Sequence, residues 1–371
     1  MDIKNSKLNN ELGILICGHG SRNKLAIDEF KILAHCIQER FSSIKVEYGF
    51  LEFAKPSLTD GLEKLKQDSV KRVIAIPAML FAAGHVKNDI PTVLMNFANN
   101  NDMEIYYGRE LGINNSMISA ACERVREVFK NNENITPSES VLVVVGRGSS
   151  DPDANANVVK VTRMIVEGLG MGWGETVFSG VTFPLVEPGL NHIVKLGYKN
   201  IIIFPYFLFT GVLVSRIKRQ RDIVAVNHPN IEFFDAKYLS SHPYVIDTFV
   251  ERINEIFSDD NNNNSMNCSL CKYRSNLFGF EKDVGLIQES HHDKVEGLGV
   301  SCDLCEAECS GACEIEILTN RRNIAVQDNE IHKDIAHSHD NPHHHHHHEA
   351  YPNSQHPLGP LTLQSANNLE S

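Results

Sequence analysis

The sequence repeats itself at a constant offset of 128 residues, and this repeat limits the folds that the chain can adopt. Ile14–Ser21 aligns with Leu142–Ser149, and Val73–Pro77 aligns with Ile201–Pro205. The same offset pairs a Glu-Arg dipeptide near the end of each copy, and no gap is needed between these matches. The chain therefore contains two tandem copies of one domain.

Each copy, placed at 1–132 and 133–258, alternates short apolar segments with longer segments of helical pattern. Strands are predicted at 12–17, 73–76, 141–145 and 201–204, and helices at 24–41, 116–130 and 243–257. This alternation predicts an α/β fold, in which each copy forms a parallel sheet with helices on both faces. Because such sheets bind ligands beyond the carboxyl ends of their strands, we expect the site in the loops that follow the strands.

The composition excludes several classes of partner. A formal net charge of −12 argues against binding to nucleic acid. No segment reaches the roughly 18 apolar residues of a membrane span, and residues 1–11 have no apolar core of a secretory signal. We therefore expect a cytoplasmic protein that contacts neither membrane nor nucleic acid. In that reducing compartment, its nine cysteines are better explained by metal binding or free thiols than by disulfides.

Residues 259–371 differ in composition from both copies and are expected to form a largely irregular, metal-binding tail. They begin with an Asn-rich linker and are rich in His, Cys, Asn and Pro. The spacing of the tail cysteines is typical of ligands for zinc or an iron–sulfur cluster, and these cysteines are Cys268, Cys271, Cys302, Cys305, Cys309 and Cys313. The spacing does not decide which of them bind the metal.

The tail also contains an uninterrupted run of histidines, His343, His344, His345, His346, His347 and His348. A cloning tag is the ordinary explanation of such a run. This run is internal, however, and further histidines surround it. We interpret it as a reservoir that raises the local concentration of incoming metal.

Three positions that could bind a metal differ between the copies. The first copy has His19, Glu52 and His85, and the second copy has Arg147, Gly180 and Leu213. Framework glycines, prolines and hydrophobic residues persist in both copies. Two imidazoles and a carboxylate are a reasonable ligand set for a divalent first-row metal. The repeat therefore predicts a metal site in the first copy only.

Three segments of the first copy resemble the sirohydrochlorin chelatases: Gly18–Arg22, Phe50–Leu58 and Pro77–Pro91. The resemblance extends over about residues 12 to 257. It implies ATP-independent insertion of a divalent metal, with His19 and His85 binding the metal and transferring protons, and Glu52 as a supporting acid. This chemistry is reasonable, because imidazole can bind a metal and accept a proton near neutral pH.

The tail is similar to the long form of the cobalt enzyme in this family. The similarity lies in Met266–Arg274, in the His-rich stretch and in His356–Pro360. It implies Co²⁺ insertion into sirohydrochlorin in the early-cobalt route of cobalamin biosynthesis, with handover of the product to the next enzyme of that pathway. It also implies an iron–sulfur cluster at the Met-x-Cys-x-x-Cys motif, although zinc stays open.

A substrate with many carboxylates predicts basic residues around the site. Arg22 and Arg147 lie in equivalent loops, and Arg147 occupies the position of His19 in the other copy. Both are candidates for pairing with substrate carboxylates. A further basic cluster of Arg216, Lys218, Arg219 and Arg221 is explained at least as well by a solvated helix face.

Two alternatives stay open. A ferrochelatase for sirohaem would need the same two copies, and only the tail favours cobalt. A metal-storage protein or metallochaperone would use the tail as its functional part, but the complete set of His19, Glu52 and His85 argues against it.

Overall fold

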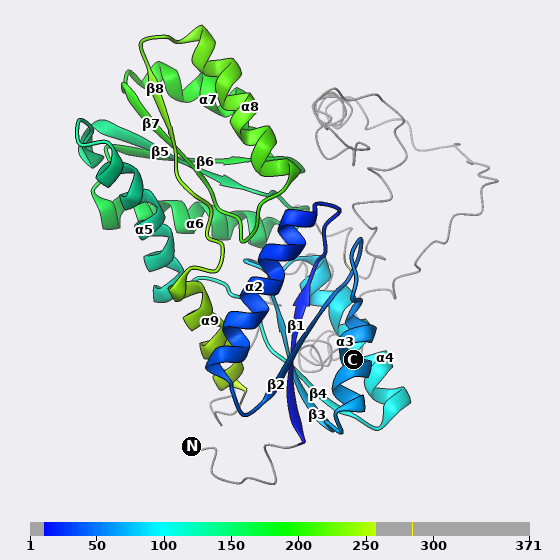
Figure 1. The fold of residues 1–371 in the computed structure, drawn as a ribbon. Coiled ribbons are helices and arrows are strands. Elements are labelled where there is room, and N and C mark those ends of the chain that lie inside the picture. Colours follow the sequence, from blue (N-terminus) through cyan, green and yellow to red (C-terminus); the bar gives the residue numbers. More distant parts are fainter. Residues whose placement is uncertain (1–10, 257–283, 285–371) are drawn as a thin grey trace, which may run out of the picture.

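The structure, a computed structural model, describes residues 11–256 and position 284. It confirms the predicted α/β fold, with two four-stranded parallel sheets in the orders β2-β1-β3-β4 and β6-β5-β7-β8 (Figure 1). The cysteine and histidine positions proposed as tail ligands lie outside the described residues. Among the described residues, no helix is both long and apolar enough to cross a bilayer.

The elements of the first half alternate strands and helices, as the sequence predicts. They are β1 (Leu12–Gly18), α2 (Lys24–Arg40), β2 (Lys45–Phe50), α3 (Leu58–Gln67), β3 (Arg72–Pro77), the π-helix η1 (His85–Asp89), α4 (Ile90–Asn101), β4 (Glu104–Tyr107) and α5 (Asn115–Asn131).

The second half repeats this order. Its elements are the 3-10 helix η2 (Pro137–Glu139), β5 (Ser140–Gly146), α6 (Pro152–Leu169), β6 (Trp173–Phe178), α7 (Val186–Ile193), the 3-10 helix η3 (Val194–Leu196), β7 (Asn200–Pro205), α8 (Val212–Asn227), β8 (Glu232–Asp235) and α9 (Pro243–Glu255).

Strand β1 is buried on both faces, which explains its continuous apolar run. Ile14 and Ile16 pack into a core that includes residues of α2 and α9, whereas Leu15 and Cys17 pack with residues of α3 and α4. The first of these cores also includes β5 residues and is therefore continuous between the two halves. Burial of both faces leaves the loops beyond the strand ends as the place for polar chemistry.

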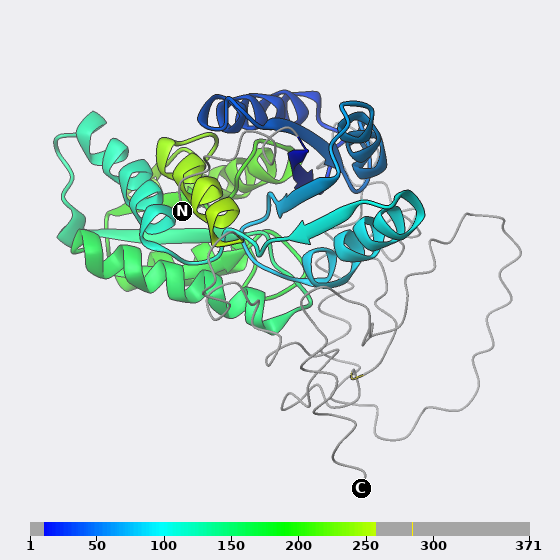
Figure 2. The same ribbon diagram turned by 90° about the horizontal axis from the view of Figure 1, so that it is seen from below.

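The last helix of each copy packs against the other half. α5 contacts α6 and β7, and α9 contacts α2 and β3 (Figures 1 and 2). Arg124 on α5 donates to the backbone oxygen of Leu239 at 2.9 Å, and Arg252 on α9 donates to that of Leu111 at 2.6 Å. These two contacts are related by the repeat. The copies at 1–132 and 133–258 are defined by the sequence, and the helix packing crosses the boundary between them.

The contacts of Arg252 predict a large cost for its removal. Its side chain is 1% exposed, and it also donates to the Glu110 carbonyl and pairs with Glu255. Arg252→Met removes the guanidinium that donates to the Glu110 and Leu111 carbonyls, while Glu255 keeps its contact with Arg109. We expect a loss of about 3 kcal/mol in the free energy of unfolding. Arg40→Met removes an exposed pair with Asp247 and should cost below about 1 kcal/mol. Urea unfolding of both variants checks this expectation, and equal losses would contradict it.

Candidate metal-binding site

The loops after β1 and β2, together with η1 beyond β3, bring three candidate ligands together. His19, Glu52 and His85 each offer a ligand atom, and these atoms lie within 4.8 Å of one another. The two imidazole rings are 4.8 Å apart between centroids and nearly perpendicular, at 81°. All three residues are partly buried. One metal ion of the first transition row could therefore contact two nitrogen ligands and one oxygen ligand here.

A close backbone approach fixes His19 beside Glu52. The Glu52 amide donates to the His19 carbonyl at 2.9 Å. Gly20 has a φ of 99°, and a Cβ atom at this position would lie 1.7 Å from the Glu52 carbonyl oxygen. Only glycine satisfies both the backbone conformation and the lack of space. The Gly-His-Gly sequence therefore positions two ligands at once.

The second copy has the same loop geometry without the ligand set. Gly148 has a φ of 85°, and its Cβ would lie 1.9 Å from the Gly180 carbonyl oxygen. The residue that follows the Glu52 position also has a positive φ in each copy, 59° for Phe53 and 67° for Val181. The scaffold is thus shared, and the side chains placed on it decide which copy can bind a metal.

His85 is held by a carboxylate from its own helical turn. Its Nδ1 lies 2.5 Å from Asp89 Oδ2, and the two side chains are 12% and 3% exposed. His19 Nδ1 lies 3.1 Å from the Gly20 carbonyl oxygen. Because these contacts engage Nδ1, each imidazole would bind a metal through Nε2. A carboxylate behind a metal-binding imidazole orients the ring and raises its basicity.

Asp89 was not identified from the sequence as a site residue. The spacing His-x-x-x-Asp could have indicated that Asp89 contacts His85, because residues four apart lie on one face of a helical turn. The η1 segment also contains Lys87, which is 1% exposed and forms an ion pair of 2.6 Å with Asp151 of the second half. The sequence carries no signal that this lysine is buried.

Arg22 lies at the edge of the ligand set. Its guanidinium carbon is 5.2 Å from the ring centroid of Phe53, and the His19 ring stacks on the same Phe53 at 6.0 Å. Phe53 is 37% exposed. A cation and an aromatic ring are therefore presented next to the candidate metal ligands.

Arg147 of the second half lies close enough to Glu52 to experience its charge. The arginine is exposed, yet surrounding protein lowers the pKa of its guanidinium, and the charge of Glu52 acts in the opposite direction. The charges of Arg147 and Glu52 are therefore near each other, although they come from different copies. A guanidinium stays protonated near neutral pH, so the position offers a fixed positive charge.

The basic cluster on α8 does not form one face. Arg216 is buried, Arg221 pairs with Asp222 and Asp235, and Lys218 and Arg219 are exposed. The solvated face expected from the sequence applies only to these last two residues.

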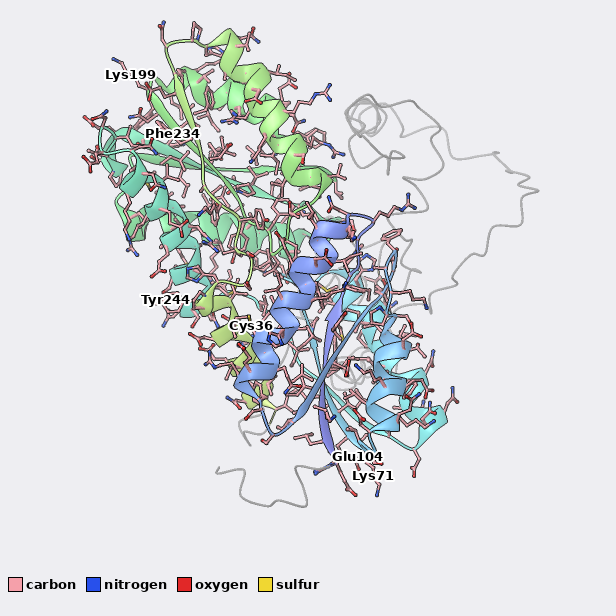
Figure 3. The ribbon with its side chains drawn as sticks, in the orientation of Figure 1. Cys36, Lys71, Glu104, Lys199, Phe234 and Tyr244 are labelled. Carbon is pink, nitrogen blue, oxygen red and sulfur yellow. The ribbon has the colours of Figure 1, made fainter. Side chains whose placement is uncertain are left out.

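The carboxyl edges of the two sheets face each other. Lys71 and Glu104, at the amino edge of the first sheet, lie on the side away from the second half (Figure 3). Lys199, next to the amino edge of the second sheet, lies at the opposite end of the molecule. The candidate ligands and Arg147 therefore lie where the two halves meet.

Comparison with known proteins identifies the family. The CbiX family model matches residues 13–128 and 141–256, one match within each copy. A sirohydrochlorin cobaltochelatase of Priestia megaterium is 36% identical over 263 residues, which are 70% of this chain and 84% of that protein. A sirohydrochlorin ferrochelatase of Bacillus subtilis (strain 168) is 28% identical over 243 residues, covering 65% and 90% of the two chains.

A solved structure shares the fold. SirB from Bacillus subtilis with Fe³⁺ has a TM-score of 0.61 and 27% identity, covering 68% of this chain and 98% of that one. The family model and the cobaltochelatase relative together identify the protein as a chelatase. The chain belongs to the CbiX family.

The two glycines of the repeat allow a matched test of the site geometry. Gly20→Ala and Gly148→Ala meet the same backbone overlap, and each should lower the free energy of unfolding by about 2–4 kcal/mol. Only Gly20→Ala displaces His19 from Glu52, so only this variant should lose metal affinity. Thermal unfolding and Co²⁺ titration of both variants give the comparison. Equal metal affinity in the two variants would show that the Gly20 turn does not position the ligands.

Proposed function

We propose that this chelatase inserts Co²⁺ into sirohydrochlorin without ATP, in the early-cobalt route to cobalamin. The observation that carries the proposal is the approach of His19, Glu52 and His85 within 4.8 Å, with Arg147 of the other copy near Glu52. The cobalt assignment draws on the relative that is 36% identical and named a sirohydrochlorin cobaltochelatase.

The residues at the site match what metal insertion requires. The metal must lose water ligands, and the macrocycle must lose two pyrrole N–H protons. In our proposal, His19 and His85 hold the metal and accept these protons, since imidazole changes charge near neutral pH. Glu52 supplies a third ligand oxygen and balances the positive charge of the metal.

Arginines would orient the substrate. Sirohydrochlorin carries carboxylates around its rim, and guanidinium groups bind carboxylates with two parallel hydrogen bonds. We assign this role to Arg147 from the second copy and to Arg22 from the first. The first copy then holds the metal, and the second copy provides the main binding contact for the macrocycle.

Substitution of these residues separates the two roles. His19→Ala and His85→Ala should reduce turnover to below about one hundredth of the wild-type value, because each removes a metal ligand and a proton acceptor. Arg147→Ala should mainly raise the KM for sirohydrochlorin, as expected for a lost binding contact. Anaerobic steady-state kinetics measure both effects, and circular dichroism confirms folding. Near-normal turnover in either histidine variant would exclude the proposed site.

Iron is the second candidate metal, because a relative that is 28% identical is named a ferrochelatase. The donor set itself suits several first-row ions. Anaerobic metallation of sirohydrochlorin with cobalt, iron and nickel, measured side by side, distinguishes the cobaltochelatase from an enzyme of sirohaem synthesis. A metal-storage protein would not bind the tetrapyrrole, and spectral titration of the protein with sirohydrochlorin tests that alternative.

We also propose that the tail handles metal. A subset of the six tail cysteines would hold an iron–sulfur cluster or zinc, and His343–His348 would concentrate the incoming metal. Absorption spectra and metal analysis of anaerobically purified protein distinguish a cluster from zinc. The proposed handover of the product belongs to the same hypothesis.

Truncation after Phe257 tests the reservoir. The three candidate ligands and Arg147 precede this residue, so the rate at saturating cobalt should stay within about twofold of wild type. The truncated protein should be slower only when free cobalt is scarce, because a tethered donor contributes an effective concentration. Initial rates against buffered free cobalt provide the measurement. Identical curves for both proteins would reject the reservoir, and a collapse at saturation would make the tail part of the catalytic machinery.

A further inference from the structure

A buried ion pair joins the two halves at the helical turn that carries His85. Lys87 Nζ lies 2.6 Å from Asp151 Oδ2, and the two side chains are 1% and 2% exposed. Lys87 lies in η1 between His85 and Asp89, and Asp151 is the N-cap of α6 in the second half. The roles proposed above use neither residue of this pair.

The Asp151 carboxylate also belongs to the loop that carries Arg147. Its second oxygen, Oδ1, accepts from the Asp153 amide at 3.0 Å and so caps α6. The Asp151 amide donates to Ser149 Oγ at 3.0 Å, and Asn155 Nδ2 donates to the Ser149 carbonyl at 2.7 Å. The loop from Arg147 to α6 is thus closed by short hydrogen bonds, so a shift of Asp151 would move this loop as well.

On the first half, Lys87 anchors a short π-helical segment. The Ile90 amide donates to the His85 carbonyl, and the Lys87 amide donates to the Ala83 carbonyl at 2.8 Å. π-helical turns are rare and are often found at functional sites. Because η1 has only five residues, the attachment of its central lysine limits where His85 at its first position can lie.

The repeat supplies an internal comparison for this pair. Ser215 occupies the position of Lys87 in the second copy, and Asn23 occupies the position of Asp151 in the first copy. Asn23 caps α2 with its side-chain oxygen, as Asp151 caps α6. Capping is therefore common to both copies, whereas the charged pair occurs only beside the copy that carries the histidines. A general need for helix capping does not explain the charge.

We propose that Lys87 and Asp151 form a positioning pair that sets His85 relative to Arg147 across the two halves. The metal ligand and the substrate anchor come from different copies, and this pair connects the segments that carry them. A buried ion pair is seldom needed for stability alone, since apolar replacements are often tolerated. The pair would instead fix the position of His85 relative to Arg147. The inference rests on the roles proposed for His85 and Arg147.

The test uses the full chain with both charges removed. Lys87→Met combined with Asp151→Asn removes both charges of the pair, and asparagine can still cap α6. Asp153, which is 3.7 Å from Lys87 Nζ and 10% exposed, loses this contact as well. We expect a folded protein in which Co²⁺ affinity and kcat/KM for sirohydrochlorin each fall about tenfold or more. Competition with a chromophoric chelator measures the affinity of the metal-free protein. Circular dichroism and thermal unfolding report the fold.

A second contact between the halves provides the matched control. Glu29 on α2 accepts from the Thr210 amide at 2.7 Å and from the Tyr238 hydroxyl, both in the second half. Glu29→Gln weakens this contact without touching η1. Its unfolding midpoint should fall while Co²⁺ affinity and kcat/KM stay at wild-type values. Lys87→Arg, which keeps the ion pair, should retain most of the activity of the wild type.

Each outcome decides the inference. Wild-type Co²⁺ affinity and kcat/KM in the double variant would overturn it, and so would equal losses in the double variant and in Glu29→Gln. If the double variant does not fold, Lys87→Gln with Asp151→Asn is measured instead, because it removes both charges and keeps polar groups at both positions, and wild-type values there would overturn the inference. Full turnover by His85→Ala would reject the proposed site itself. Loss of turnover by His85→Ala with an unaffected double variant would reject only the positioning pair.

Discussion

The exchange of the last helix between the two copies is the constraint on which the rest of the structure depends. α5 lies against the second half and α9 against the first, and Arg124 and Arg252 fasten each helix to a backbone carbonyl of its new neighbour. This arrangement makes one continuous core out of two repeats and turns the carboxyl edges of both sheets toward each other. Residues that follow strands in either copy can then act on one ligand.

Duplication of the domain explains how the site can be asymmetric within a symmetric scaffold. Both copies keep the glycine whose φ is positive and whose Cβ would overlap a backbone carbonyl of the next loop. On that shared turn, the first copy presents His19 and the second presents Arg147. In the proposed mechanism, one loop type therefore supplies a metal ligand on one side and a carboxylate anchor on the other. The buried Lys87–Asp151 pair connects the segment that carries His85 to the loop that carries Arg147.

The choice of metal is not a property of the three candidate ligands alone. Two imidazoles and a carboxylate bind several first-row ions, with affinities that follow the general order for divalent metals. The relatives reflect this breadth, since one is named a cobaltochelatase and another a ferrochelatase. Selection among metals would then depend on their delivery and on the shape imposed by the macrocycle. The proposed role of the tail, which raises the local supply of metal, acts at the first of these steps.

The sequence by itself determined the duplication, the α/β class and the strands that are buried on both faces. The repeat and the apolar runs can be read directly from the order of the residues. It also singled out His19, Glu52 and His85, since comparison of the copies exposes exchanged side chains. It missed β2, β4, β6 and β8, whose half-exposed residues give weaker patterns. The exchange of helices, the burial of Lys87 and the approach of Arg147 to Glu52 were decided only by the tertiary structure. Each depends on which surfaces of two distant segments meet, and no local pattern encodes that pairing.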